Sequence, residues 1–111
     1  MTQPAAGPVH VVAVITGKPG TGDVLEPMLI ALAEGTHTEP DCLLYGLQRG
    51  LDNPDQFTTV EKWTSTDALA AHLSTPHVQT ALGSAGEYLA EPPLIIPSLP
   101  VAAGDASKSA Y

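Results

Sequence analysis

The sequence predicts an α+β protein with a ferredoxin-like fold, a four-stranded antiparallel sheet with its helices on one face. Two observations predict this fold. Segments rich in β-branched residues alternate with segments whose apolar residues recur at helical spacing, in the order strand, helix, strand, strand, helix, strand. That order is a split βαβ arrangement, and a chain of 111 residues has the length of one domain.

The first strand and the first helix are separated by a glycine-rich loop. Residues 9–16 are dense in valine and isoleucine, and they end at the loop 17–22. From Asp23 onwards, apolar residues recur at helical spacing over roughly fifteen residues. Thr21 or Asp23 is the expected N-cap, and Pro27 is tolerable if it lies in the first turn.

The next two strands form a predicted hairpin. Glu39 precedes a proline and is therefore disfavoured in the α conformation, which ends the first helix. Residues 42–49 are the second strand and residues 56–63 the third. The segment between them, 50–55, contains Gly, Asp, Asn and Pro, the residues typical of turns.

The second helical region is expected in two pieces, each with its own start signal. Ser65 or Thr66 caps a short helix that runs through Leu73. Thr75 is a capping hydroxyl followed by proline at the first helical position, and it opens a helix over about residues 77–89.

The end of the chain gives the last strand and a tail. Residues 92–99 are apolar but contain prolines, which confine the strand to an edge of the sheet. Residues 101–111 are expected to be a mobile tail, and residues 1–8 a loose leader. The folded domain is then expected over residues 9–100.

Composition excludes several classes of partner. Four Lys and Arg residues face twelve Asp and Glu residues, which leaves a formal net charge of −8. Nucleic acids and anionic membrane surfaces are therefore not expected partners, because binding either one relies on a basic patch. No segment is long and apolar enough to cross a bilayer, and the start lacks a signal peptide pattern, so we expect a cytoplasmic protein.

Two strands are apolar on both sides. In residues 9–16 valines point to both faces, and in residues 42–49 Leu44 lies opposite Leu43, Tyr45 and Leu47. The helices of one chain cover only one face of the sheet. We therefore expect a homodimer packed sheet to sheet.

The run from Phe57 to His72 carries the groups that an enclosed site needs. Here the predicted third strand turns directly into a helix, which brings the only indole of the chain, Trp63, near a carboxylate, Glu61, and an imidazole, His72. The other histidines show no HxH pair and no i, i+4 pair around a carboxylate, and Cys42 is the only cysteine, so no metal site is predicted.

Several of these patterns together resemble the antibiotic biosynthesis monooxygenase family, over roughly residues 9–100. The residues that carry the resemblance are Glu39-Pro-Asp-Cys42, Tyr45, Phe57, Glu61-Lys-Trp63, Ala68-Leu-Ala-Ala-His72 and Ser74-Thr-Pro-His77. The resemblance implies a dimeric α+β barrel and oxygenation of an electron-rich aromatic, such as a quinol or an anthrone, by dioxygen without a cofactor. Haem breakdown is disfavoured, because the first strand has no Asn.

The resemblance also implies roles for particular residues. His72 is the candidate base or donor, and Glu61 the candidate group that orients it. The predicted substrate-binding residues, which wall or stack on the aromatic ring, are Trp63, Tyr45, Phe57 and His77.

Each of these residues also has a purely structural interpretation. Trp63 can be a core anchor, Glu61 can pair with a Lys or His across the sheet, and His72 can be a half-buried capping group. His77 can simply face solvent. Two other functions remain open, a non-catalytic dimeric module that binds a small apolar metabolite, and a polyketide isomerase or cyclase that uses the same base.

Overall fold

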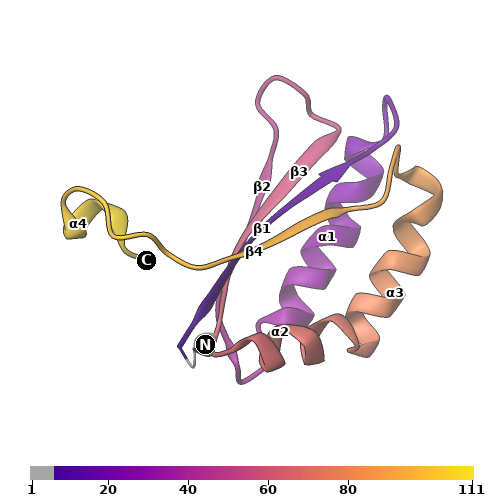
Figure 1. Ribbon diagram of the computed structural model, residues 1–111. Coiled ribbons are helices and arrows are strands. Elements are labelled where there is room, and N and C mark those ends of the chain that lie inside the picture. The colour runs from indigo at the N-terminus through magenta and orange to yellow at the C-terminus, as the bar shows by residue number, and fades with distance from the viewer. Residues whose placement is uncertain (1–6) are drawn as a thin grey trace.

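The computed structural model describes residues 7–111, so six of the eight residues predicted as a leader lie outside the described residues (Figure 1). The elements in chain order are β1 (Val9–Thr16), α1 (Gly22–Thr36), β2 (Cys42–Arg49), β3 (Gln56–Trp63), α2 (Thr66–Leu73), α3 (Pro76–Ala85), the 3-10 turn η1 (Gly86–Tyr88), β4 (Leu94–Ser98) and α4 (Ala106–Ser109).

The four strands form one antiparallel sheet in the order β2-β3-β1-β4. The two central strands pair along their whole length, from Val9 opposite Trp63 to Thr16 opposite Gln56. Helices α1, α2 and α3 lie on one side of the sheet (Figure 1). The predicted ferredoxin-like fold is confirmed, and β4 is an edge strand as its prolines require.

The side of the sheet that faces the helices carries the core. Every second residue of β3 is buried, and so is every second residue of β1, because successive side chains on a strand point to opposite faces. Two clusters result. One surrounds Trp63 and Val11, and the other surrounds Phe57, Leu25 and Leu29.

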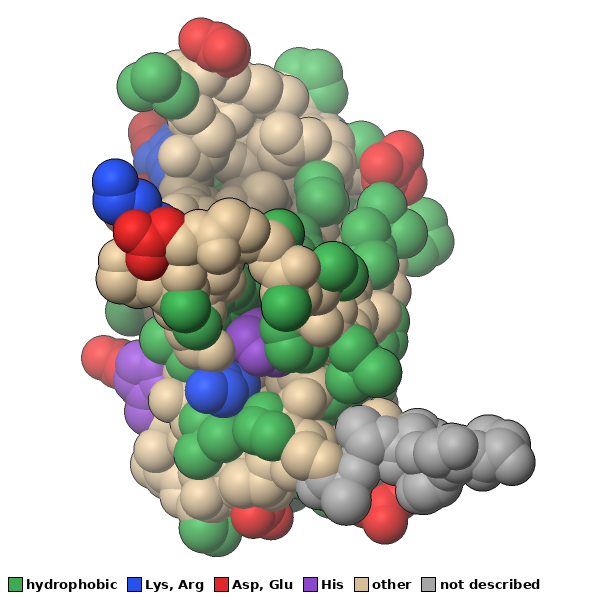
Figure 2. Space-filling model, turned by 60° about the vertical axis from the view of Figure 1, so that its left-hand side comes forward, with side chains coloured by type: hydrophobic (Ala, Val, Ile, Leu, Met, Phe, Trp, Pro, Cys, Tyr) green, Lys and Arg blue, Asp and Glu red, His purple; other side chains and the backbone are tan. Residues whose placement is uncertain are grey.

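Helices α1, α2 and α3 leave the opposite side of the sheet uncovered, and within residues 7–111 only the C-terminal segment with α4 lies on that side, where Tyr111 packs against His10 (Figure 1). Large apolar side chains remain exposed there on three strands: Val12 is 38% exposed, Leu44 40% and Ile96 43%. In Figure 2, which brings this side forward, hydrophobic side chains are numerous and charged ones few over the middle of the molecule. This apolar area is the open face of the sheet.

The chain end differs from the prediction in two places. The third helix ends at Ala85 and continues only as the 3-10 turn η1. The segment 101–111, predicted as a mobile tail, contains the short helix α4, and its last residue, Tyr111, packs edge-on against His10 with ring centroids 4.6 Å apart. Within residues 7–111, no helix combines the length and the apolar character needed to span a membrane.

The N-terminus of α1 is capped from the β2–β3 turn. Thr21 is the N-cap residue but makes no side-chain cap hydrogen bond. Instead, the Asp55 carboxylate accepts hydrogen bonds from the backbone N–H groups of Gly22, at 2.8 Å, and Gly20, at 3.0 Å. These hydrogen bonds lower the pKa of Asp55, because they stabilise its charged form.

This lowered pKa predicts how stability depends on pH. A group with a folded-state pKa below its unfolded value of about 3.9 contributes stability above that pH, and the contribution disappears as pH falls through the folded pKa. We predict that Asp55→Asn unfolds at lower urea concentration than the wild type at neutral pH, and that the two proteins converge as pH falls through the folded-state pKa of Asp55. The control, Asp52→Asn, changes an exposed acid of the same turn. Wild-type and Asp55→Asn curves that stay parallel throughout would contradict the role of Asp55.

Candidate active site

An apolar pocket lies between the sheet and the helical layer. Its volume is about 70 Å³, and side chains from the sheet, α1, α2 and α3 line it. Most of the lining is aliphatic. The polar side chains that line it are Tyr45, Thr59, Glu61 and His72. A mostly apolar cavity with a few convergent polar groups is the usual form of a small-molecule site.

His72 lies in the last turn of α2 and is buried. Ser65 caps this helix by accepting a hydrogen bond from the backbone N–H of Ala68, at 3.1 Å. Ala68, Leu69 and His72 are the buried residues of α2, and their three- and four-residue spacing puts them on one helix face toward the sheet. The imidazole packs on the indole of Trp63, with ring centroids 4.4 Å apart.

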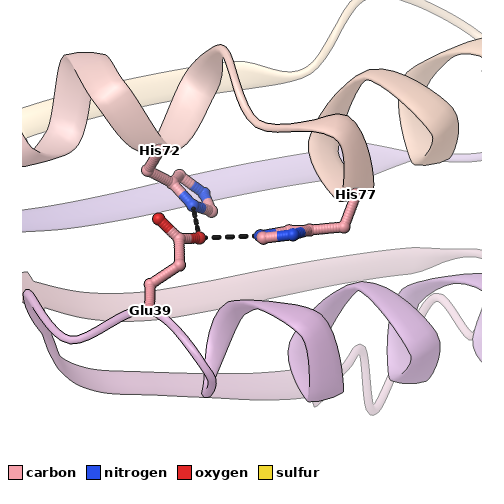
Figure 3. A group of neighbouring side chains, drawn as sticks. All are labelled: Glu39, His72 and His77. Carbon is pink, nitrogen blue, oxygen red and sulfur yellow. Dashed lines mark hydrogen bonds and ion pairs between the residues drawn. The ribbon is translucent and has the colours of Figure 1, made fainter.

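A second carboxylate, Glu39, connects His72 to His77. His72 Nδ1 lies 2.6 Å and His77 Nε2 2.7 Å from the same oxygen, Oε2 of Glu39. Figure 3 shows both rings directed at that oxygen, His72 from α2 and His77 from the start of α3. An ionised carboxylate only accepts hydrogen bonds, so both nitrogens are the donors.

This arrangement fixes the orientation of the His72 ring. When Nδ1 carries the proton that it donates to Glu39, a neutral imidazole has its lone pair on Nε2. Within residues 7–111, no side chain or backbone group hydrogen-bonds Nε2. His72 as a residue lines the apolar pocket.

Glu39 is a residue whose role the sequence did not reveal. It lies in the connection after α1, where His37 is the C-cap residue and donates from Nε2 to the backbone carbonyl of Tyr45, at 2.9 Å. That contact ties the connection to β2. The only signal at the sequence level was an acidic residue directly before a proline, which is part of the family pattern.

Glu61 lies in the pocket wall with different partners. Its Oε1 accepts a hydrogen bond from Trp63 Nε1, at 2.9 Å, and its Oε2 accepts one from the Thr59 hydroxyl, at 2.7 Å. Only 5% of the residue is exposed. The sequence predicts Glu61 as the group that orients His72, whereas the carboxylate at hydrogen-bond distance from His72 is Glu39.

Burial raises the pKa of two groups beside the site. Tyr45 lines the pocket, and the pKa of its hydroxyl is raised mainly by burial and further by the Glu61 carboxylate. It therefore keeps its proton at neutral pH and remains a hydrogen-bond donor. The pKa of the Cys42 thiol is raised by burial, with Glu39 adding to the effect, so this thiol is not activated as a nucleophile.

The other predicted site residues lie outside the pocket lining. Trp63 is fully buried behind His72. Phe57 belongs to the second core cluster, with the Arg49 guanidinium 5.4 Å from the centre of its ring. His77 lines a separate hollow between α1 and α3. Their role in substrate binding stays a prediction.

Fold and pocket together define a small α+β protein that keeps an apolar chamber between its sheet and its helices. A sequence model of the antibiotic biosynthesis monooxygenase family matches residues 8–83. The chain belongs to this family, which confirms the resemblance inferred from its motifs. The matched segment contains Glu39, His72 and His77 together with three of the four sheet strands.

Solved structures agree with this assignment. A crystal structure of an antibiotic biosynthesis monooxygenase is 26% identical to the chain, with a TM-score of 0.80, and the alignment covers 85% of this chain and 99% of that one. Rv0793 from Mycobacterium tuberculosis is 26% identical, with a TM-score of 0.79, over 89% of this chain and 100% of its own. PA3566 from Pseudomonas aeruginosa is 28% identical, with a TM-score of 0.80, over 86% and 96%. No curated protein matches the chain.

Proposed function

We propose that the protein is a cofactor-independent monooxygenase that oxidises an electron-rich aromatic, such as a quinol or an anthrone, with dioxygen. The observation that carries the proposal is His72, a buried imidazole that lines an apolar pocket and whose other nitrogen is held by Glu39. Membership of the antibiotic biosynthesis monooxygenase family supports the class of reaction.

His72 acts as the base in this proposal. Its Nε2 takes a proton from the substrate, and the resulting imidazolium is stabilised by the Glu39 carboxylate at Nδ1. The apolar lining keeps bulk water away from the reacting anion. Tyr45, whose raised pKa keeps the hydroxyl protonated, donates a hydrogen bond to the oxyanion that forms.

The reaction balances without a further reductant when the substrate has a CH₂ group between two aryl rings and conjugated through them to a ketone, as in an anthrone. Loss of one C–H proton to His72 gives a delocalised anion, which transfers one electron to dioxygen. The substrate radical and superoxide then form a C–O bond, and the imidazolium returns its proton to the outer oxygen. Loss of the second C–H proton with cleavage of the O–O bond leaves a carbonyl group and one water.

The pocket must widen before such a substrate binds. An engineered cavity that binds benzene has a volume of about 150 Å³, whereas this pocket measures about 70 Å³. Three lining side chains are more than a third exposed: Leu73 at 36%, Ile95 at 39% and Leu82 at 42%. Rotation of these side chains is the smallest change that enlarges the chamber.

The functional unit in this proposal is a homodimer joined through the open face of the sheet. Val12, Leu44 and Ile96 expose apolar surface there, and a second copy would remove that surface from water. The dimer forms the α+β barrel expected from the resemblance. Because the site faces the helices of its own chain, the dimer contact lies on the other side of the sheet from His72.

Activity of two variants tests the role of His72. We predict that His72→Ala lowers turnover of an anthrone by about 100-fold or more, which is the usual contribution of a positioned base. Glu39→Gln is expected to lose about tenfold, because it removes the charge that stabilises the imidazolium but leaves Nε2 in place. The measurement is oxygen uptake with product identified by mass spectrometry.

The control for this test is His37→Gln, which keeps a donor for the Tyr45 carbonyl outside the pocket and is expected to keep wild-type turnover. Full turnover by His72→Ala would contradict the base assignment. Isomerised or cyclised product without oxygen uptake would identify the isomerase alternative. Thermal stabilisation by the aromatic without turnover would identify a binding module.

Lysine substitutions at two similarly exposed valines test whether the open face of the sheet forms the dimer contact. We predict that the wild type sediments as a dimer at micromolar concentration and that Val12→Lys, which puts a charge on the open face, sediments as a monomer. Val24 on α1 is similarly exposed, at 42% against 38% for Val12, so Val24→Lys is expected to stay dimeric. A monomeric wild type in analytical ultracentrifugation would remove this part of the proposal.

A further inference from the structure

Three potential metal ligands that are far apart in the sequence meet at one end of the helical layer. They are Glu39 from the connection after α1, His72 from the end of α2 and His77 from the start of α3. One ligand atom from each, the two ring nitrogens and a carboxylate oxygen, lies within 4.8 Å of the others. Figure 3 shows that both rings turn these nitrogens toward the carboxylate rather than away from it.

We propose that Glu39, His72 and His77 bind a divalent transition-metal ion, with Zn²⁺ as the best fit. Two imidazoles and one carboxylate are a donor set that suits Zn²⁺ and its neighbours, and three protein ligands leave the fourth tetrahedral position to water. Nothing in the local sequence spacing indicates such a site. The fold creates it by bringing the three residues together.

The ligand atoms must shift before they accept the ion. Two atoms bound to one tetrahedral Zn²⁺ lie roughly 3.3 Å apart. The two hydrogen bonds to Glu39 measure 2.6 and 2.7 Å, so each nitrogen must move away from the carboxylate oxygen by roughly 0.6 to 0.7 Å. The two ring nitrogens, which lie within 4.8 Å of each other, must take up the same spacing. The ion then takes the place of the two protons that now lie between the carboxylate and the rings, and each neutral imidazole carries its proton on the other ring nitrogen instead.

The two histidines are held in place by their surroundings. The His72 ring packs against Trp63, and its backbone carbonyl accepts a hydrogen bond from the Thr75 hydroxyl, at 2.7 Å. His77 lies directly against α1, where a Cβ at Gly35 would come within 3.0 Å of His77 Cβ and Cγ. Ligands that are already fixed lose little conformational freedom when a metal binds.

The cluster is reachable from solvent. The His77 side chain is 26% exposed and the Glu39 side chain 15%. His77 also lines the hollow between α1 and α3, which opens to the outside. An ion and its water therefore have a path to the site that does not pass through the apolar pocket.

The metal would act on the base of the reaction. A neutral imidazole that binds an ion through Nδ1 carries its proton on Nε2, the nitrogen available to the pocket. His72 would then be a donor and no longer a base, so Zn²⁺ is expected to inhibit turnover. This consequence rests on the proposed function, whereas the binding of metal does not.

The binding test uses the full, untagged chain with Zn²⁺ in calorimetry and Co²⁺ in visible absorption. We expect one ion per chain and an intense absorption typical of four-coordinate Co²⁺. His77→Gln is expected to weaken Zn²⁺ binding by at least about tenfold. Glu39→Gln should do the same, and it serves as the second variant if His77→Gln does not fold.

The matched control is His37→Gln, a histidine of the same chain outside the cluster, which should bind Zn²⁺ as the wild type does. Absence of Zn²⁺ binding at about 100 μM would overturn the site, and so would equal weakening by His77→Gln and His37→Gln. A separate outcome concerns the proposed function alone. Zn²⁺ that binds with the expected variant pattern but leaves anthrone turnover unchanged supports the metal site and contradicts His72 as the base.

Discussion

One carboxylate oxygen holds the helical layer together at the end of the sheet where the site lies. Oε2 of Glu39 accepts hydrogen bonds from His72 and His77, and so joins the chain after α1 to the end of α2 and the start of α3. Hydrogen bonds to a charged group contribute about 1.5–3 kcal/mol each, more than neutral ones. Removing the carboxylate would release both rings at once, so the position of His72 depends on a residue outside the pocket.

The sheet supplies the other half of the site. Its helix-facing side carries a hydrogen-bonded row along β3, in which Thr59 and Trp63 both donate to Glu61. Thr59 and Glu61 of this row line the pocket. None of the hydrogen bonds in the row involves His72, whose ring is hydrogen-bonded to Glu39. The polar side chains that line the pocket are Tyr45, Thr59, Glu61 and His72. Among their side-chain polar atoms, the Tyr45 hydroxyl and His72 Nε2 have no hydrogen-bond partner within residues 7–111.

The parts of this architecture that depend on local sequence were predictable, and those that depend on long-range contact were not. Alternation in residues 9–16 and 56–63 predicted both strands and their buried sides, because the side-chain period of a strand is two. No local spacing connects residue 39 to residues 72 and 77, so sequence motifs did not predict that Glu39, His72 and His77 lie together. The capping of α1 by Asp55, 33 residues from Gly22 along the chain, was missed for the same reason.

The protonation of the two His72 nitrogens is the most direct test of the arrangement that Glu39 imposes. Long-range ¹H–¹⁵N correlation NMR on the ¹⁵N-labelled, metal-free protein distinguishes the two neutral tautomers of each histidine. We predict that neutral His72 carries its proton on Nδ1 and has an unprotonated Nε2, and that Glu39→Gln leaves a mixture of the two forms. A wild-type His72 with its proton on Nε2 would contradict both the role of Glu39 and the free base in the pocket.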